Sequence, residues 1–129
     1  MSHFITIRTD LREREHLLAA LRDLGHVPEE GEGLTVSGDS QKTETAEILV
    51  RTGCGFDVGL RRAGEGYEVV ADWYRVEQLT SLRRQAFIRE LTRRYAYRVI
   101  CAQAKEQNLI VEEERVENGD IVIVLSERG

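Results

Sequence analysis

The chain has 129 residues, of which 41% are hydrophobic and 32% charged, and its formal net charge at pH 7 is −5. This composition excludes a disordered chain, because the hydrophobic content is too high and the net charge too low. A chain of this length buries roughly two thirds of the surface that its unfolded form exposes, so its folding requires neither a disulfide nor a structural metal. We therefore predict a single folded domain over residues 1–129.

Two features predict the compartment in which the protein is found. The first ten residues contain no apolar stretch of signal-peptide length, and no window approaches the roughly 18 apolar residues that a membrane-spanning helix requires. Cys54 and Cys101 form no CxxC pair, so we expect two reduced thiols and no disulfide framework. Together these features predict a cytoplasmic protein without a membrane segment.

The N-terminal segment is predicted to form a strand and then a helix. Residues His3 to Thr9 alternate and are rich in β-branched side chains, which is typical of a strand. Asp10 and Glu13 have the spacing of a capping box, so a helix is predicted to begin directly after Asp10. Gly25 is predicted to end this helix. Its core-facing stripe consists of Leu11, Leu17, Leu18, Leu21 and Leu24.

The middle of the chain is predicted to be an antiparallel meander. From Gly31 to Tyr74 the hydrophobic period is two and the segments are separated by glycines, which favours hairpin-connected strands over crossover helices. The polar run from Gly38 to Thr45 is predicted to be a mobile loop. The four predicted strands are Gly33–Ser37, Glu47–Thr52, Phe56–Arg62 and Tyr67–Trp73.

The last third is predicted to form a long helix from Thr80 to Gln107, which Asn108 ends, and a final hairpin. The hairpin strands, Ile110 to Val116 and Ile121 to Ser126, flank an Asn-Gly pair that tolerates the positive φ angles of a tight turn. The core-facing side of the helix consists of Phe87, Ile88, Leu91, Tyr95, Val99 and Ala102.

These elements predict the fold class. Their order, βαββββαββ, fits an α+β two-layer sandwich in which an antiparallel sheet carries two main helices on one face. Many unrelated functions share such architectures, so a function does not follow from the fold.

The most pronounced electrostatic feature lies between Arg75 and Arg98, where seven arginines and two acidic residues give a net charge of +5. Three interpretations are open: a solvated helix face whose arginines pair with the protein's own acids, a surface for an acidic protein partner, or a nucleic-acid surface. The overall pI of about 5.3 weighs against a dedicated nucleic-acid binder. On this flank the candidate partner-binding residues are Arg83, Arg94, Tyr97, Arg98 and Lys105.

Two adjacent aromatic residues, Trp73 and Tyr74, precede the arginine-rich segment. At the end of a predicted strand they point to opposite faces of the sheet, so one of them should be partly exposed. If Trp73 takes the core, Tyr74 becomes a contact anchor for a partner. In the alternative interpretation, the aromatic residue packs under the connection formed by residues 78–82.

The sequence contains no pattern that supports catalysis or metal binding. It lacks paired catalytic carboxylates, a Ser-His-Asp arrangement and a phosphate-binding glycine loop, and its histidines and cysteines have no familiar ligand spacing. We therefore predict neither an enzyme nor a cofactor. Gly53, Cys54 and Gly55 are interpreted as a bulge or turn, with a small-ligand site between sheet and helices as the alternative. Glu112 and Glu114 share one face of a predicted strand and are interpreted as charges that protect a strand edge from pairing, with binding of a hard cation as the alternative.

Several short pieces of the chain together resemble a known family. They are Met1-Ser2-His3-Phe4, Leu18, Ala20-Leu21, Asp23-Leu24-Gly25, Phe56-Asp57-Val58-Gly59, Tyr67 to Trp73, and Tyr95-Ala96. In this order they are similar to the family of hypothetical chloroplast reading frame thirty-five (ycf), also known as domain of unknown function 1257. The resemblance implies a small stand-alone protein associated with gene neighbourhoods that contain an AAA-type ATPase, and it supplies no catalytic residue. The arginine-rich second helix and the polar loop from Gly38 to Thr45 differ from the plastid-like members, which argues against a photosynthetic role.

The leading hypothesis from the sequence is a non-enzymatic accessory protein. It binds a larger protein, with an ATPase complex as the candidate, through the basic flank of the second helix and the Trp73-Tyr74 end. Nucleic-acid binding by the same flank is the second hypothesis, and a small ligand near Cys54 is the third. The oligomeric state is left open by the sequence.

Overall fold

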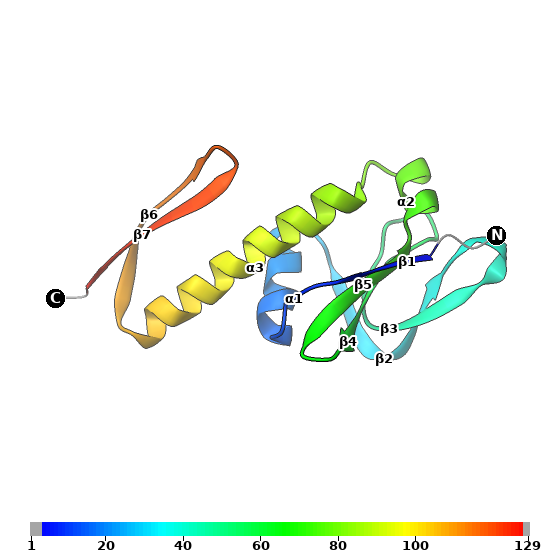
Figure 1. Cartoon of the computed structure of the whole chain (residues 1–129), viewed down its shortest axis with the longest axis horizontal. Coiled ribbons are helices and arrows are strands. Elements are labelled where there is room, and N and C mark those ends of the chain that lie inside the picture. The colour runs from blue at the N-terminus through cyan, green and yellow to red at the C-terminus, as the bar shows by residue number, and fades with distance from the viewer. Residues whose placement is uncertain (1–3, 128–129) are drawn as a thin grey trace.

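A computed structural model, which describes residues 4–127, shows seven strands and three α-helices (Figure 1). It confirms the predicted α+β class and the predicted order of elements, with α2 as one additional short helix. His3, with which the predicted first strand began, lies outside the described residues. The elements are β1 (Phe4–Arg8), α1 (Arg14–Asp23), β2 (Pro28–Ser37), β3 (Thr43–Val50), β4 (Val58–Ala63), β5 (Gly66–Asp72), α2 (Trp73–Leu79), α3 (Arg84–Glu106), β6 (Leu109–Glu117) and β7 (Asp120–Glu127).

The strands form two separate antiparallel sheets. The larger sheet has the order β1-β5-β4-β3-β2, which confirms the predicted antiparallel meander of β2 to β5. Strand β1 adds to this meander by pairing with β5. Strand β1 pairs with β5 such that Phe4 lies opposite Asp72. The final hairpin, β6 and β7, forms the second sheet, which stands away from the first at the far end of α3 (Figure 1).

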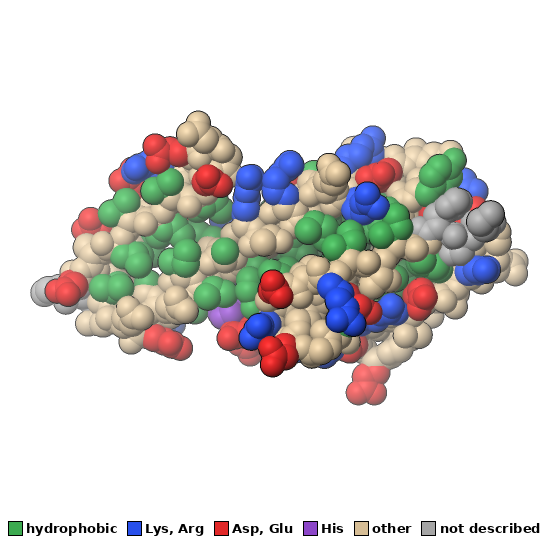
Figure 2. Space-filling model, viewed as in Figure 1, with side chains coloured by type: hydrophobic (Ala, Val, Ile, Leu, Met, Phe, Trp, Pro, Cys, Tyr) green, Lys and Arg blue, Asp and Glu red, His purple; other side chains and the backbone are tan. Residues whose placement is uncertain are grey.

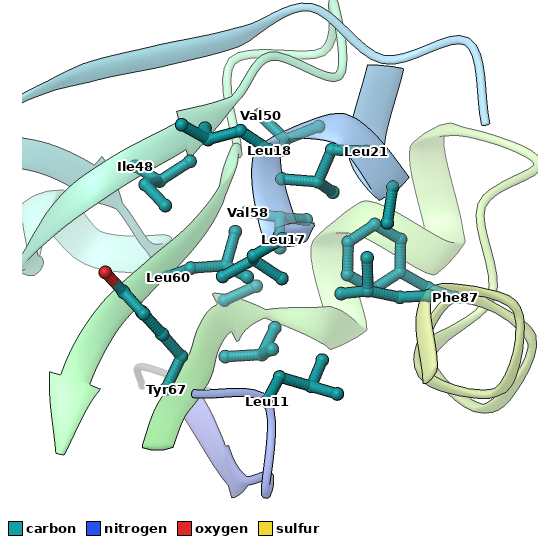
Figure 3. Close-up of a cluster of buried hydrophobic side chains, with 14 of the residues drawn as sticks. Leu11, Leu17, Leu18, Leu21, Ile48, Val50, Val58, Leu60, Tyr67 and Phe87 are labelled. Carbon is teal, nitrogen blue, oxygen red and sulfur yellow. The ribbon is translucent and has the colours of Figure 1, made fainter. Parts of the chain in front are cut away.

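The main core lies between the larger sheet and the helices α1 and α3. Figure 3 shows Leu17 of α1, Leu60 of β4 and Phe87 of α3 directed into it. Each alternate residue of β4 and β5 faces this core, because side chains in a strand point alternately to the two sides. The largest fully buried side chains of this cluster are Trp73, Tyr67, Phe87, Leu17, Leu21, Ile48, Leu60 and Leu91.

The opposite face of the sheet has a smaller core of its own. Strand β2 contains a register shift between Glu30 and Leu34, and its second half curls over β4 and β5. Val36 and Ala46 thereby lie against Gly59, where a Cβ atom would come within 2.5 and 2.7 Å of their side chains. Strand β2 begins at Pro28, whereas the sequence predicted a strand from Gly33. A proline is tolerated there because β2 is an edge strand.

The predicted capping box at the start of the first helix is wrong. Helix α1 begins at Arg14, its N-cap is Glu13, and no side-chain cap bond forms. The phenol oxygen of Tyr95 instead accepts hydrogen bonds from the backbone amides of Arg12 and Glu13, at 3.1 and 2.9 Å. A side chain from α3 thus takes over the capping role that the sequence assigned to Asp10. Leu11 is buried as predicted, although it lies before the helix.

The segment Gly38 to Thr45, predicted to be a mobile loop, is an ordered connection. A short turn at Asp39–Gln41 leads into β3, which begins at Thr43. The backbone amide of Asp39 donates to the carboxylate of Asp72 at 2.9 Å, and its side chain pairs with Arg75 at 3.1 Å. These long-range bonds fix the turn.

The predicted strand Tyr67–Trp73 ends one residue early, and Trp73 begins helix α2. The side chain of Asp72 caps this helix by accepting from the amide of Arg75 at 3.2 Å. Trp73 is 1% exposed and Tyr74 54% exposed. The predicted contrast between a buried and an exposed aromatic residue is present, but it arises in a helix rather than a strand.

The predicted long helix begins later than expected, at Arg84. The Thr80 hydroxyl donates to the carbonyl oxygen of Val76 at 2.7 Å and accepts from the amide of Leu82 at 3.1 Å, which forms a separate turn between α2 and α3. The helix ends before Asn108, which has a φ of 57°, as predicted. The final hairpin is also confirmed, with φ values of 50° and 82° at Asn118 and Gly119.

Candidate partner-binding surface

Two of the predicted site residues, Arg94 and Arg98, face α1 and bind Asp23. The distance from Arg94 Nε to Asp23 Oδ2 is 2.8 Å, and Arg98 Nε donates to the same oxygen at 2.6 Å. The guanidinium of Arg94 also stacks on the Tyr97 ring at 4.0 Å from its centroid. Of the interpretations offered for the basic flank, pairing with the protein's own acid describes these two arginines.

The hydrogen bonds from Arg98 and Arg94 lower the pKa of Asp23 to about 2. Because the folded-state pKa lies below the unfolded one, this contribution to stability is present above about pH 4 and is lost as the pH falls towards 2. We expect Asp23→Asn to lower the free energy of unfolding at pH 7 by about 1 kcal/mol, since solvent screens a surface pair. Urea unfolding at pH 7 and pH 2.5 measures this, and the loss should shrink at pH 2.5.

The matched control for Asp23→Asn is Glu15→Gln, which removes the same charge from an exposed position of α1. We expect it to change stability by less than about 0.5 kcal/mol at either pH. An equal effect of Asp23→Asn at both pH values would contradict the role of the arginine pair.

Tyr97 and Lys105 lie towards the hairpin end of α3. An interaction with the Glu114 carboxylate, followed by burial, raises the pKa of the Tyr97 phenol. Tyr97 therefore lies beside β6. Lys105 is exposed and lies about 33 Å along the helix axis from Arg83, at about 1.5 Å per residue. The predicted residues do not form one surface.

The predicted residues Trp73, Tyr74 and Arg83 come together where α2 meets α3. We call the surface formed by Tyr74, Arg83, Arg84 and Arg89 the α2–α3 corner. Tyr74 is 54% exposed. Trp73 lies beneath the surface, with its ring 5.7 Å from that of Phe87, and supports the corner without reaching its exterior.

The arginines of the corner differ from Arg94 and Arg98 in their partners. Arg83 donates to the backbone carbonyl oxygens of Glu77, Thr80 and Leu82 at 2.9, 3.0 and 3.2 Å. These bonds stabilise the C-terminal end of α2, and all three acceptors are uncharged. Arg89 is exposed on α3. Figure 2 shows Lys and Arg side chains over the N-terminal half of α3 and beside α2, and Asp and Glu side chains around the hairpin.

The corner is also hollowed. A cavity of about 500 Å³ is lined by Phe4, Ile5, Trp73 and Tyr74, and a second of about 400 Å³ by Arg83, Arg89 and two neighbouring residues; Glu77 and Arg84 line both. The Glu77 carboxylate accepts from the backbone amide of Arg84 at 2.8 Å and thereby fixes the start of α3. The corner therefore combines apolar and cationic depressions on a well-anchored turn.

Sequence reasoning missed Arg84 and Arg89 as members of this surface. The missing step was helix α2 itself. Asp72 as an N-cap, followed by apolar residues at Val76 and Leu79, is a local signal that could have predicted it.

Gly53, Cys54 and Gly55 form a turn between β3 and β4, as the first interpretation predicted. Gly53 and Gly55 have φ values of 84° and 89°. Thr52 Oγ1 donates to the carbonyl oxygen of Phe56 at 2.8 Å and lies 3.0 Å from Cys54 Sγ, so the turn is held by its own side chains. A cavity of about 380 Å³ next to this turn is lined by Thr52 but by none of the three turn residues.

Residues 4–127 contain no group of three or more His, Cys, Asp or Glu side chains placed to hold a metal ion. Within the same range, none of the helices has the length and apolar character needed to cross a membrane.

The fold and the corner define a small α+β protein with a basic, aromatic-bearing surface. A family model described as "Protein of unknown function (DUF1257)" matches residues 20–124, so the chain belongs to the DUF1257 family.

The chain is similar to the "Uncharacterized protein ycf35" of Guillardia theta, with 32% identity over 97% of this chain and 96% of the relative. The proteins of the same name from Cyanophora paradoxa and Pyropia yezoensis are 26% and 30% identical, over 97% and 83% of this chain and 96% and 81% of the relatives. The predicted family is thus confirmed. The search of solved structures gave no significant match.

Proposed function

We propose that this chain is a cytoplasmic, non-catalytic accessory protein that binds an acidic surface of a larger protein through the α2–α3 corner. The observation that carries the proposal is the exposure of Tyr74, 54%, beside a depression that it lines together with Arg84. Tyrosine and arginine are enriched among the residues that dominate binding energy at protein interfaces. The two free, half-buried cysteines suit a reducing compartment.

Charge favours an acidic partner. The whole chain carries −5, whereas the corner has three arginines, and Glu77 is the one carboxylate among the described residues that line its two depressions. The corner is therefore a local positive region on an acidic protein. Such a region attracts an acidic partner to this surface, and the negative charge on the rest of the chain repels the same partner elsewhere. The ATPase suggested by the family resemblance is the first candidate partner to test.

Nucleic-acid binding is less well supported than protein binding. Arg94 and Arg98, in the middle of the basic flank, are occupied by Asp23, which reduces the positive charge available for a phosphate backbone. The arginines of the corner lie beside a depression that is lined by Phe4, Ile5 and Tyr74, and a protein interface combines polar and apolar groups in this way.

The proposal is tested with the tagged whole chain as bait in lysate of its host, treated with nuclease, at about 0.1 M and 0.5 M salt. We expect one protein to be captured, and we expect Tyr74→Ala/Arg89→Glu to weaken its measured affinity at least tenfold, since each change removes a contact at an interface centre. Both positions are exposed, so the fold should be retained, which circular dichroism checks.

The control is Arg22→Glu, an equal charge reversal at an exposed position of α1. It should bind as the unchanged chain does, because α1 lies outside the corner. Capture that is equally strong with the double variant would overturn the corner as the binding surface. Recovery of nucleic acid alone, lost at high salt, would favour the nucleic-acid alternative.

A further inference from the structure

Strand β7 is built as an interior strand but lies at an edge. Its centre is a run of five apolar residues, Ile121 to Leu125, which places apolar side chains on both faces. Such runs are typical of strands that are covered on both faces. None of the residues in β7 is fully buried, and Leu125 is 37% exposed. Figure 2 shows apolar side chains open to solvent over the hairpin and the adjoining half of α3.

The hairpin is also incomplete as a sheet. Within residues 4–127 it consists of β6 and β7 alone, and α3 is the element that makes most of the contacts with it. A two-stranded sheet is at best marginally stable in water, and a third strand or further packing is needed to stabilise it. The outer edge of β7 presents backbone amide and carbonyl groups that another strand can pair with.

The two outer edges of the hairpin differ in charge. Strand β6 carries one arginine, Arg115, which pairs with Glu113 and Glu117, and four glutamates, which are Glu112, Glu113, Glu114 and Glu117. Its net charge is −3, so a second β6 placed beside it would bring two acidic strands together. Strand β7 has no charged residue between Asp120 and Glu127. The edge of β7 therefore accepts a copy of itself, and the edge of β6 rejects one.

We infer that two copies of this chain pair through the outer edges of their β7 strands. An antiparallel register centred on Ile123 places Ile121 opposite Leu125 and Val122 opposite Val124 of the second copy. In this register Asp120 lies opposite Ser126, so no like charges meet. The result is a four-stranded sheet in the order β6-β7-β7-β6, whose two outer edges are acidic.

The oligomeric state of the whole chain tests this inference. Light scattering after size-exclusion chromatography should give twice the chain mass of 14.7 kDa. Ile123→Lys places two lysines opposite each other on the symmetry axis and should reduce the mass to that of one chain. The matched control, Val116→Lys, introduces the same side chain at a position of β6 that is 71% exposed, and should remain dimeric.

A cross-linking variant makes the test independent of any loss of folding in Ile123→Lys. In a Cys54→Ser/Cys101→Ser background, Ile123→Cys should form a disulfide between copies when dissolved oxygen is supplied as the oxidant. Directly opposed Cβ atoms approach to about 4.5 Å, which is the upper end of the separation that a disulfide spans. Val116→Cys should cross-link at least tenfold more slowly. A monomer at concentrations of tens of micromolar, or equal cross-linking of both variants, would overturn the inference.

Discussion

Replacing Asp72 with alanine is expected to lower the free energy of unfolding by about 3 kcal/mol. The side chain is fully buried and accepts from two backbone amides, those of Asp39 at 2.9 Å and Arg75 at 3.2 Å. Each buried donor left without a partner costs about 1–3 kcal/mol, and the N-cap of α2 is lost as well. Urea denaturation of the purified chain measures the change.

The control for Asp72→Ala is Asp10→Ala, which removes an exposed carboxylate near the start of the chain. We expect this control to lie within about 0.5 kcal/mol of the unchanged protein. Because Asp72 positions the first turn of α2, Asp72→Ala should also weaken partner binding at the α2–α3 corner. A variant as stable as Asp10→Ala would show that the two amides find other acceptors.

The second large effect is expected for Gly59→Ala, which should destabilise the chain by about 2–3 kcal/mol. The new Cβ would lie 2.5 Å from Val36 Cγ2 and 2.7 Å from Ala46 Cβ, both closer than atoms can approach. Ala46 has no side-chain freedom with which to retreat, so β3 itself must shift. Forced overpacking of a well-filled core typically costs about 1–3 kcal/mol.

A double-mutant cycle separates this crowding from a general effect of alanine in a strand. Val36→Ala removes one of the two obstructing groups, so its combination with Gly59→Ala should be less harmful than the sum of the single changes by about 1 kcal/mol. Leu91→Ala, a buried position of α3 in the main core, should combine additively with Gly59→Ala. Additivity in both pairs would contradict the close approach of β2 to Gly59.

The parts of the fold that sequence reasoning predicted correctly depend on local signals. The turn of the final hairpin is fixed by Asn118 and Gly119, which adopt positive φ angles of 50° and 82° without help from distant residues. Gly25, with a φ of 89°, ends α1 in the same way. The hydrophobic period of two between Gly31 and Tyr74 likewise predicted the antiparallel meander correctly.

The parts that sequence reasoning missed depend on contacts between distant residues. The amides at the start of α1 are capped by Tyr95, 82 and 83 positions further on, so the capping box between Asp10 and Glu13 was not needed. Helix α2 depends on a carboxylate that also holds the turn at Asp39. These hydrogen bonds join residues that are far apart in the chain, so local helix propensity does not predict them.

The candidate site was predicted in part for the same reason. The arginine-rich segment and the exposed Tyr74 are visible in the sequence, but the carboxylate that occupies Arg94 and Arg98 lies 71 and 75 positions earlier, in α1. The packing of α1 against α3 therefore decides which arginines form ion pairs with Asp23 and which lie at the α2–α3 corner.

The position of β1 determines the order in which the sheet can assemble. Strands β2 to β5 are successive hairpin neighbours, whereas β1 pairs with residues 68–72, near the middle of the chain. Closing so long a loop has an entropic cost that neighbouring strands avoid. During synthesis β1 leaves the ribosome first, yet its partner strand is made last among the five. The earliest-made strand is thus the last to join the sheet, and until then the edge of β5 is open to incorrect partners.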